Sequence, residues 1–279
     1  MYDCTEVPAR KQPSSDEPED QYSPPDWLPL MRRLTQVCES WGVWKNVDSA
    51  LIGRGDVDSV CIANERPAAL LEFTSWASDR GYGPVFTCDH LPTPLIALAV
   101  DRQRLIQFDL WGYAVFRGAP MFVAQDLVPL MSMDERGFRR LRTGAEGLFL
   151  LLLNGTRHGG RPRPADIAAK RIIELLNEDW GGVEAASGFF GRAGSSCLRL
   201  AKAATNGGWD RRSAVEVEAW AIQRAIRQPR MLASRARFRT TARWRCPVLS
   251  TLAHGRTISM DPSDWILKVR ESHLIHEIA

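Results

Sequence analysis

The sequence has few lysines, no closely paired cysteines and no long apolar run. Its six cysteines contain no C-x-x-C pair, which argues against a zinc site or a disulfide framework and favours a reducing cytoplasm. The longest apolar stretch, 147–153, is far shorter than the ~20 residues that a membrane span needs. No basic segment followed by an apolar one opens the chain, so we expect a cytoplasmic protein without an export signal. Only five of the 36 basic residues are lysines, a bias that GC-rich codon usage also produces.

What the chain contains is an ordinary globular composition with an uneven charge distribution. Of its 279 residues, 44% are hydrophobic and 25% charged, enough to bury the core of one or two domains. Residues 1–25 carry two basic and six acidic side chains among many prolines and serines, so we expect a disordered acidic tail there. By contrast, the segment 224–245 carries eight arginines and no acid.

The spacing of apolar residues predicts two kinds of structure in succession. Residues 27–41 read as a helix that Gly42 can end. Short strand candidates follow at 43–45, 57–62, 84–88, 95–100 and 104–111, with a helix over 67–80 among them. From residue 127 onward the pattern predicts helices, roughly at 134–154, 166–178, 196–205, 213–227 and 262–275. We therefore expect an α+β fold, with a mixed-sheet domain at 26–125 and a helical domain at 126–279.

The most informative stretch is Gly53-Arg54-Gly55-Asp56-Val57-Asp58. Asp56 and Asp58 lie two apart at the start of a strand, so both side chains project from one face. Two neighbouring carboxylates repel unless a cation neutralises them, and all-oxygen ligation suits Mg²⁺. Gly53 and Gly55 would let the backbone turn tightly and approach a phosphate, with Arg54 nearby. The plain alternative is a solvated turn before a strand.

A third acid fits the same arrangement. Asp109 shares a strand face with Leu105 and Gln107, while the intervening apolar residues face the other way. If this strand lies beside 57–62, three carboxylates converge. Two metal ions held in that way can clamp a triphosphate, and the third acid can take the proton from an attacking hydroxyl.

Together these features resemble the DNA polymerase β-type nucleotidyltransferase superfamily. The shared features are a preceding helix, the Asp-x-Asp on one strand, the third Asp on a later strand and a helical C-terminal part. Superfamily members usually carry a Gly-Ser or Gly-Gly pair about ten residues before the Asp-x-Asp, where this chain has Lys45-Asn46. Some members of the uncharacterised bacterial branch have a similar Leu-Lys-Gly or Lys-Asn element, and also resemble the chain from Phe108 to Pro120. The resemblance covers roughly residues 27–180.

The resemblance implies a nucleotidyltransferase-like sheet with flanking helices and a Mg²⁺-dependent reaction, with Mn²⁺ as the alternative ion. Asp56 and Asp58 would ligate the metals and Asp109 would be the third acid. Lys45 and Asn46 would contact the phosphates of a nucleoside triphosphate such as ATP. The implied reaction moves a nucleotidyl group to an acceptor and releases pyrophosphate.

Three further side chains are candidate contacts for the acceptor or the phosphates. His90 follows a strand near the expected site, where a polar strand-end histidine is the alternative. Arg139 and Arg142 precede a strongly apolar helix, and guanidinium groups match phosphate oxygens well. The alternative for both arginines is a solvated helix entry paired with nearby acids.

The arginine-rich segment 224–245 bears on the partner of the protein. Arginines surround Phe238 and Trp244 there, a mixture typical of nucleic-acid binding. A basic element at a membrane surface and a surface helix paired with acids elsewhere are the alternatives. The sequence as a whole leaves three hypotheses for the function. The first is a nucleotidyltransferase with a small-molecule acceptor, and the second is a nucleotidyltransferase with an RNA acceptor such as a tRNA end. The third is a non-catalytic scaffold that binds nucleotide or nucleic acid.

Overall fold

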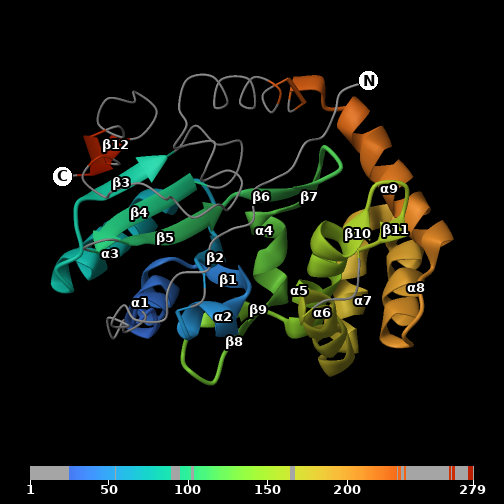
Figure 1. Ribbon diagram of the computed structural model, residues 1–279, viewed down its shortest axis with the longest axis horizontal. Coiled ribbons are helices and arrows are strands. Elements are labelled where there is room, and N and C mark those ends of the chain that lie inside the picture. The colour runs from blue at the N-terminus through green and yellow to red at the C-terminus, as the bar shows by residue number, and fades with distance from the viewer. Residues whose placement is uncertain are drawn as a thin grey trace, which may run out of the picture.

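The computed structural model describes residues 25–53, 55–88, 95–101, 104–163, 167–230, 232–233, 236, 264, 266–267 and 276–278. The expected tail (apart from residue 25), Arg54, His90, the arginines beyond 230 and most of the expected helix 262–275 lie outside these residues. The described chain is a mixed α/β structure in which a large sheet occupies one side and a group of helices the other (Figure 1). No helix within the described ranges has the length and apolar character needed to span a membrane.

The main sheet has eight strands and mixes parallel with antiparallel pairs. In spatial order these are β12 (His276–Ile278), β3 (Val85–Cys88), β4 (Leu95–Asp101), β5 (Arg104–Trp111), β2 (Val57–Val60), β1 (Gly42–Lys45), β9 (Arg139–Leu141) and β8 (Met131–Met133). The pairs β2–β5 and β1–β9 are parallel, and the other neighbours are antiparallel. The parallel β2–β5 pair lies in the middle of the sheet and positions the candidate site.

Two helices, α1 (Leu28–Val37) and α3 (Arg66–Asp79), cover one face of this sheet. Phe73 of α3 stacks on Phe108 of β5, with ring centroids 5.2 Å apart. Ile106, Phe108 and Leu110 all belong to the apolar core beneath these helices. Because successive strand residues alternate between faces, Gln107, Asp109 and Trp111 lie on the opposite face.

A second apolar core lies among the helices that follow. The connecting elements are the hairpin β6 (Tyr113–Phe116) and β7 (Ala119–Val123), α4 (Ala124–Leu127), a 3-10 turn η1 (Val128–Leu130) and the hairpin β10 (Thr156–Arg157) and β11 (Arg161–Pro162). The helices are α5 (Thr143–Leu150), the π-helical turn η2 (Leu151–Gly155), α6 (Ile167–Glu178), α7 (Trp180–Ser187), the 3-10 helix η3 (Gly188–Ala193), α8 (Gly194–Thr205) and α9 (Arg211–Ile226). Their buried side chains pack against β6 and β7, which connect the sheet to the helices in Figure 1.

The prediction of a helix at 134–154 is wrong over the first part of that range. Residues 139–141 form β9, which pairs with β1 and β8, and the helix α5 begins only at Thr143. Gly137 has a φ of 86° and closes a turn with Asp134, a conformation that a helix cannot contain. The main sheet therefore takes three strands, β8, β9 and β12, from beyond residue 125, while the division of the chain into domains stays a prediction.

The other expected strands and helices over the described residues are found with small shifts at their ends. Strands occur at β1, β2, β3, β4 and β5, and helices at α1, α3, α6, α8 and α9. The pattern missed the hairpin β6–β7, the short helix α2 (Val47–Leu51) and the helix α7. The hairpin and α7 are buried on several sides, so their apolar residues show no clean period.

Candidate active site

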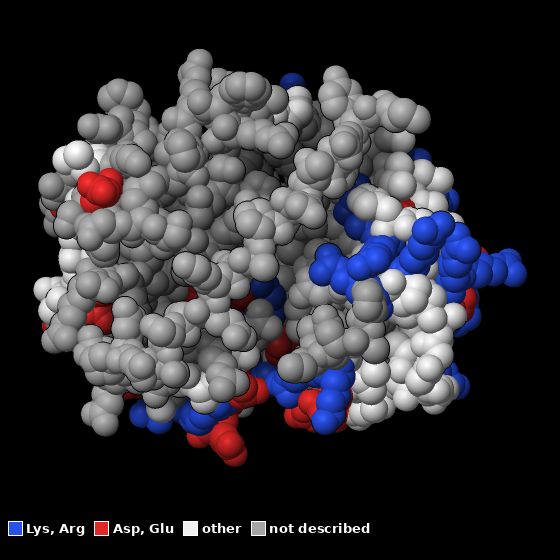
Figure 2. Space-filling model, viewed as in Figure 1, with Lys and Arg blue, Asp and Glu red and all other residues white. Residues whose placement is uncertain are grey.

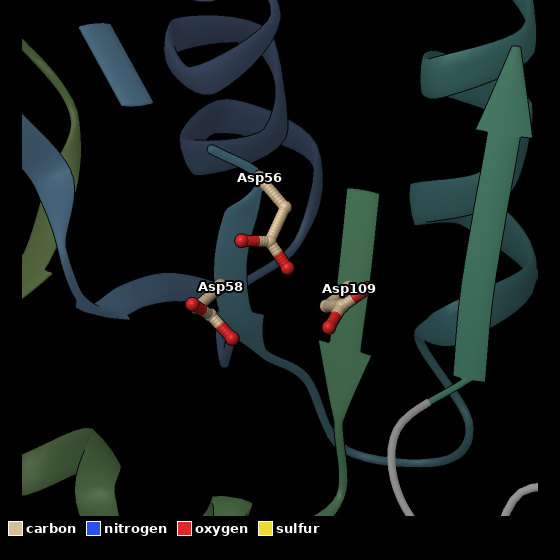
Figure 3. A group of neighbouring side chains, drawn as sticks. All are labelled: Asp56, Asp58 and Asp109. Carbon is tan, nitrogen blue, oxygen red and sulfur yellow. The ribbon is translucent and has the colours of Figure 1, made fainter. Parts of the chain in front are cut away.

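The three aspartates are brought together by the register of two parallel strands. Asp58 of β2 lies directly opposite Asp109 of β5, as the sequence predicted if these strands were neighbours. Asp56 immediately precedes β2 and lies two residues from Asp58, so its side chain projects on the same side. Figure 3 shows the three carboxylates pointing toward one another.

These carboxylates form a tight and largely buried group. One oxygen from each lies within 4.8 Å of the others. Asp58 is 1% exposed and Asp109 is 4% exposed, while Asp56 is half-buried. Burial, together with repulsion from Asp56, raises the pKa of Asp58 to about 6 despite the attraction of Lys45. Burial and the charges of the other two aspartates raise the pKa of Asp109 well above its usual range.

Two side chains of β5 hold the carboxylates in place. The Gln107 amide donates to Asp56 Oδ2 at 3.0 Å and to Asp109 Oδ1 at 2.9 Å. The indole N–H of Trp111 donates to Asp58 Oδ1 at 3.1 Å. Gln107, Asp109 and Trp111 alternate along one strand face, so β5 supplies an acid and its two supporting donors. The sequence pattern placed Gln107 on this face but gave neither residue a role in the site.

Lys45 lies at the site, as expected. It ends β1 opposite Asp58, and its ammonium lies 2.6 Å from Asp58 Oδ2. The same ammonium lies 5.1 Å and 5.7 Å from the ring centroids of Trp44 and Trp111, within range of a cation–π contact. Burial lowers the pKa of Lys45, but the attraction and hydrogen bond of Asp58, together with the charges of Asp56 and Asp109, raise this pKa overall. Lys45 is therefore a cation placed against the acid cluster.

Asn46 also lies at the site and has an unusual backbone conformation. Its φ of 58° and ψ of 25° place it in the left-handed region, directly before α2. Its side-chain amide donates to Asp58 Oδ2 at 3.4 Å. Its backbone N–H donates to Glu146 Oε1 at 2.8 Å, and Glu146 is buried and paired with Arg140. Glu146, which the sequence pattern did not single out, thus links α5 to this turn.

The glycines of the expected phosphate loop form the turn between α2 and β2. Gly53 and Gly55 have φ values of 73° and 103°, which side-chain-bearing residues rarely adopt. The backbone N–H of Gly53 donates to the carbonyl of Ala50 and so closes the end of α2. Arg54, between them, lies outside the described residues. The predicted approach of this turn to a phosphate stays a prediction.

The structure does not bring Arg139 or Arg142 to the acid cluster. Arg139 donates to the carbonyls of Cys38 and Trp41, each at 3.0 Å, and so ties β9 to the connection between α1 and β1. Arg142 pairs with Asp179, which begins α7, with a 3.0 Å hydrogen bond from Nε. His90 is not among the described residues. Contacts of these three side chains with phosphate or acceptor stay predictions.

The donor set suits a divalent cation. Three carboxylates supply only oxygen ligands, and burial together with their mutual repulsion disfavours their ionised forms even with Lys45 adjacent. A cation bound between them would relieve this repulsion and offer open positions to further oxygen ligands. Comparisons of the chain with protein-family models, with curated proteins and with solved structures find no match.

Proposed function

We propose that this protein is a Mg²⁺-dependent nucleotidyltransferase of the DNA polymerase β type. The observation that carries the proposal is the direct pairing of Asp58 with Asp109 across parallel strands, with Asp56 beside them. The turn at Lys45 and Asn46 lies against the same carboxylates, at the place where superfamily members carry their phosphate-binding pair. The proposed substrate is a nucleoside triphosphate, with a small molecule as the first candidate acceptor.

In this proposal, Asp56, Asp58 and Asp109 hold Mg²⁺. When bound, Mg²⁺ supplies the positive charge that lets the carboxylates and a triphosphate occupy the same site. Lys45 exchanges part of its contact with Asp58 for a phosphate oxygen, since its flexible side chain already reaches Asp58. Asn46, fixed by Glu146, presents its amide to the phosphates.

The reaction forms one bond and breaks one. The acceptor hydroxyl oxygen bonds to the α-phosphorus of the triphosphate, and the bond from that phosphorus to the bridging oxygen of pyrophosphate breaks. The hydroxyl proton passes to Asp109, which lies opposite Asp58 and can accept it. Pyrophosphate leaves with the electron pair of the broken bond.

A labelling experiment tests this proposal. Purified protein is incubated with each α-³²P-labelled nucleoside triphosphate, Mg²⁺, and either the small-molecule or the RNA fraction of a cell extract. We expect Mg²⁺-dependent label in one fraction and equimolar pyrophosphate. Asp58→Asn and Asp109→Asn should abolish the transfer, whereas Asp126→Asn, which changes an exposed acid of α4, should retain it. Nucleotide binding without any transfer would favour the scaffold, and full activity of both site variants would contradict the assignment.

A further inference from the structure

A hollow on the helical side of the molecule is lined by cations and an aromatic ring. It has a volume of about 340 Å³ and lies between η3 and the C-terminal half of α9. Its lining residues are Arg192, Trp220, Gln223, Arg224 and Arg227. None of these described residues is an acid, so the three arginine side chains give the hollow a net positive charge.

Helical spacing accounts for how four of these residues come together. Trp220, Gln223 and Arg224 of α9 and Arg227, which caps its C-terminus, follow the i, i+3, i+4, i+7 pattern and share one stripe. Arg192 comes from η3 and donates to the side-chain oxygen of Gln223. The stripe from Trp220 to Arg227 is about 10 Å long at 1.5 Å per residue, which exceeds the size of a single phosphate group.

The positive charge of this hollow is not neutralised by neighbouring acids. Neither Arg192 nor Arg224 nor Arg227 has an ion pair with a carboxylate of the described residues. Residues 188–230 contain eight basic and three acidic side chains, and all three acids are bonded elsewhere. Asp210 caps α9, Glu216 pairs with Arg199 and Arg212, and Glu218 pairs with Arg117. Three converging guanidinium groups therefore favour an anionic partner.

The helix dipole explains only part of this arrangement. Cations near a helix C-terminus are stabilised by the last carbonyl groups, which accounts for Arg224 and Arg227. Arg192 belongs to a different helix and gains nothing from the end of α9. Its guanidinium nevertheless lies on the same hollow and contacts Gln223 of α9. The three arginines therefore lie together because two separate helices meet at this hollow, and the dipole of α9 alone does not account for their arrangement.

Trp220 adds a stacking surface to these charges. Its ring is partly buried against the core and lies 5.3 Å from the ring of Phe190, measured between centroids. The guanidinium carbon of Arg224 lies 5.2 Å from the Trp220 ring centroid. Aromatic rings combined with arginines are the usual means of holding single strands, because bases stack and cations meet phosphates.

We propose that this hollow binds a single-stranded nucleic acid. Arg192, Arg224 and Arg227 contact successive phosphates of its backbone, and Trp220 stacks on one base. The arginine-rich segment 224–245 begins at this point of the chain. The proposal goes beyond nucleotidyl transfer, because binding of the strand does not require the acid cluster.

The test measures binding of fluorescein-labelled 20-nucleotide single-stranded RNA and DNA by fluorescence anisotropy, without Mg²⁺ or nucleoside triphosphate. The site variant is Arg192→Gln/Arg224→Gln/Arg227→Gln. The matched control is Arg157→Gln/Arg161→Gln/Arg163→Gln, which removes the same charge from the exposed β10–β11 hairpin. Figure 2 shows basic side chains gathered over this hairpin and α9, so the control also tests a diffuse basic surface.

We expect the site variant to raise the Kd at least about tenfold. It should also reduce the slope of log K against log salt by about 2, because each of the three lost phosphate contacts contributes roughly 0.7. Trp220→Leu should weaken binding, and Trp220→Phe should retain most of it. The control should change the Kd less than about threefold. Equal losses in both triple variants, unchanged binding in the site variant, or binding only to vesicles of anionic lipid would overturn the proposal. Asp58→Asn should bind the strand normally, which separates this result from any failure of the proposed reaction.

Discussion

Asp58 and Asp109 face each other across the parallel strands β2 and β5, and both are nearly inaccessible to solvent. Such a pair is costly without a cation, because neither burial nor mutual repulsion favours two ionised carboxylates. Lys45 offsets the charge of Asp58, whereas Asp109 is supported by an uncharged Gln107 amide. In the metal-free protein, burial and the two neighbouring aspartates therefore disfavour the ionised form of Asp109.

Asp109→Asn should stabilise the metal-free protein at pH 7–8. The variant removes a carboxyl group whose ionised form is disfavoured by burial and by two neighbouring aspartates, and it keeps an oxygen that accepts from Gln107. We expect the Tm to rise by about 2–4 °C, the shift that ~1 kcal/mol produces in a chain of this size. Differential scanning calorimetry in the presence of a chelator measures it, with Asp126→Asn as control. A lower Tm in Asp109→Asn than in the control would contradict the electrostatic account.

The same carboxylates should make the stability of the metal-free protein fall as pH rises through about 6. The pKa of Asp58 is raised to about 6, above the ~3.9 of an unfolded chain, so the native state holds protons that the unfolded state has released. The stabilisation from this bound proton is complete below the pKa of Asp58 in the unfolded chain, and it is lost as the pH rises through the pKa of Asp58 in the folded protein. Urea titrations between pH 4.5 and 8 measure the slope, which Mg²⁺ should abolish. A slope unaffected by saturating Mg²⁺ would contradict the account.

The backbone of Asn46 predicts an order among its substitutions. Glycine tolerates the left-handed conformation and alanine does not, so Asn46→Gly should be nearly neutral and Asn46→Ala should cost about 1 kcal/mol. Urea unfolding measures the difference. Both variants lose the amide donated to Asp58, so both should weaken nucleotide binding to a similar extent. Equal stability of the two variants would show that the turn is not held in this conformation.

Glu146 should be important for stability through its acceptor oxygens rather than its charge alone. Its carboxylate accepts from the Asn46 N–H and pairs with Arg140 while buried. Glu146→Ala leaves both groups without this partner and should cost about 2–4 kcal/mol, whereas Glu146→Gln keeps an acceptor and should cost less. The free energy of unfolding in urea checks this order, and equal costs for the two variants would contradict it.

Asp134 should contribute stability that is lost in acid. Hydrogen bonds from Arg136 hold the pKa of Asp134 at about 2, below the ~3.9 of an unfolded chain. A depressed pKa means that the contribution is complete above about pH 4 and declines as pH falls toward 2. Asp134→Asn should therefore lower stability by about 1 kcal/mol at pH 6 and have little effect at pH 2. Thermal unfolding at the two pH values checks it, and an equal loss at both would exclude the ionic contribution.

The carboxylate cluster could be predicted from the sequence because strand alternation fixes which side chains share a face. Asp56 with Asp58, and Asp109 with Gln107, follow from that rule alone, and only the pairing of β2 with β5 had to be supplied by the fold. Lys45 and Asn46 were located by resemblance, and the left-handed φ of Asn46 gives a physical reason for asparagine at this position, because asparagine adopts that conformation more readily than most residues.

The residues that sequence reasoning missed depend on contacts distant along the chain. Glu146 reaches Asn46 across 100 positions, and no local pattern predicts such a bond. The same limit explains the error at 139–141, where pairing with β1 outweighs a helix-like sequence. Arg139 and Arg142 looked suited to phosphates, but both guanidinium groups are already bonded to the chain in the described structure.

The most direct test of the central claim is a titration with Mn²⁺ followed by electron paramagnetic resonance, in which bound Mn²⁺ loses its free six-line signal. The wild type should bind about one to two ions, more tightly when a nucleoside triphosphate is present, and Mg²⁺ should displace them. Asp58→Asn and Asp109→Asn should lose this binding, and Asp126→Asn should keep it. Binding in the wild type no tighter than in the two site variants would contradict the claim that Asp56, Asp58 and Asp109 form a metal centre.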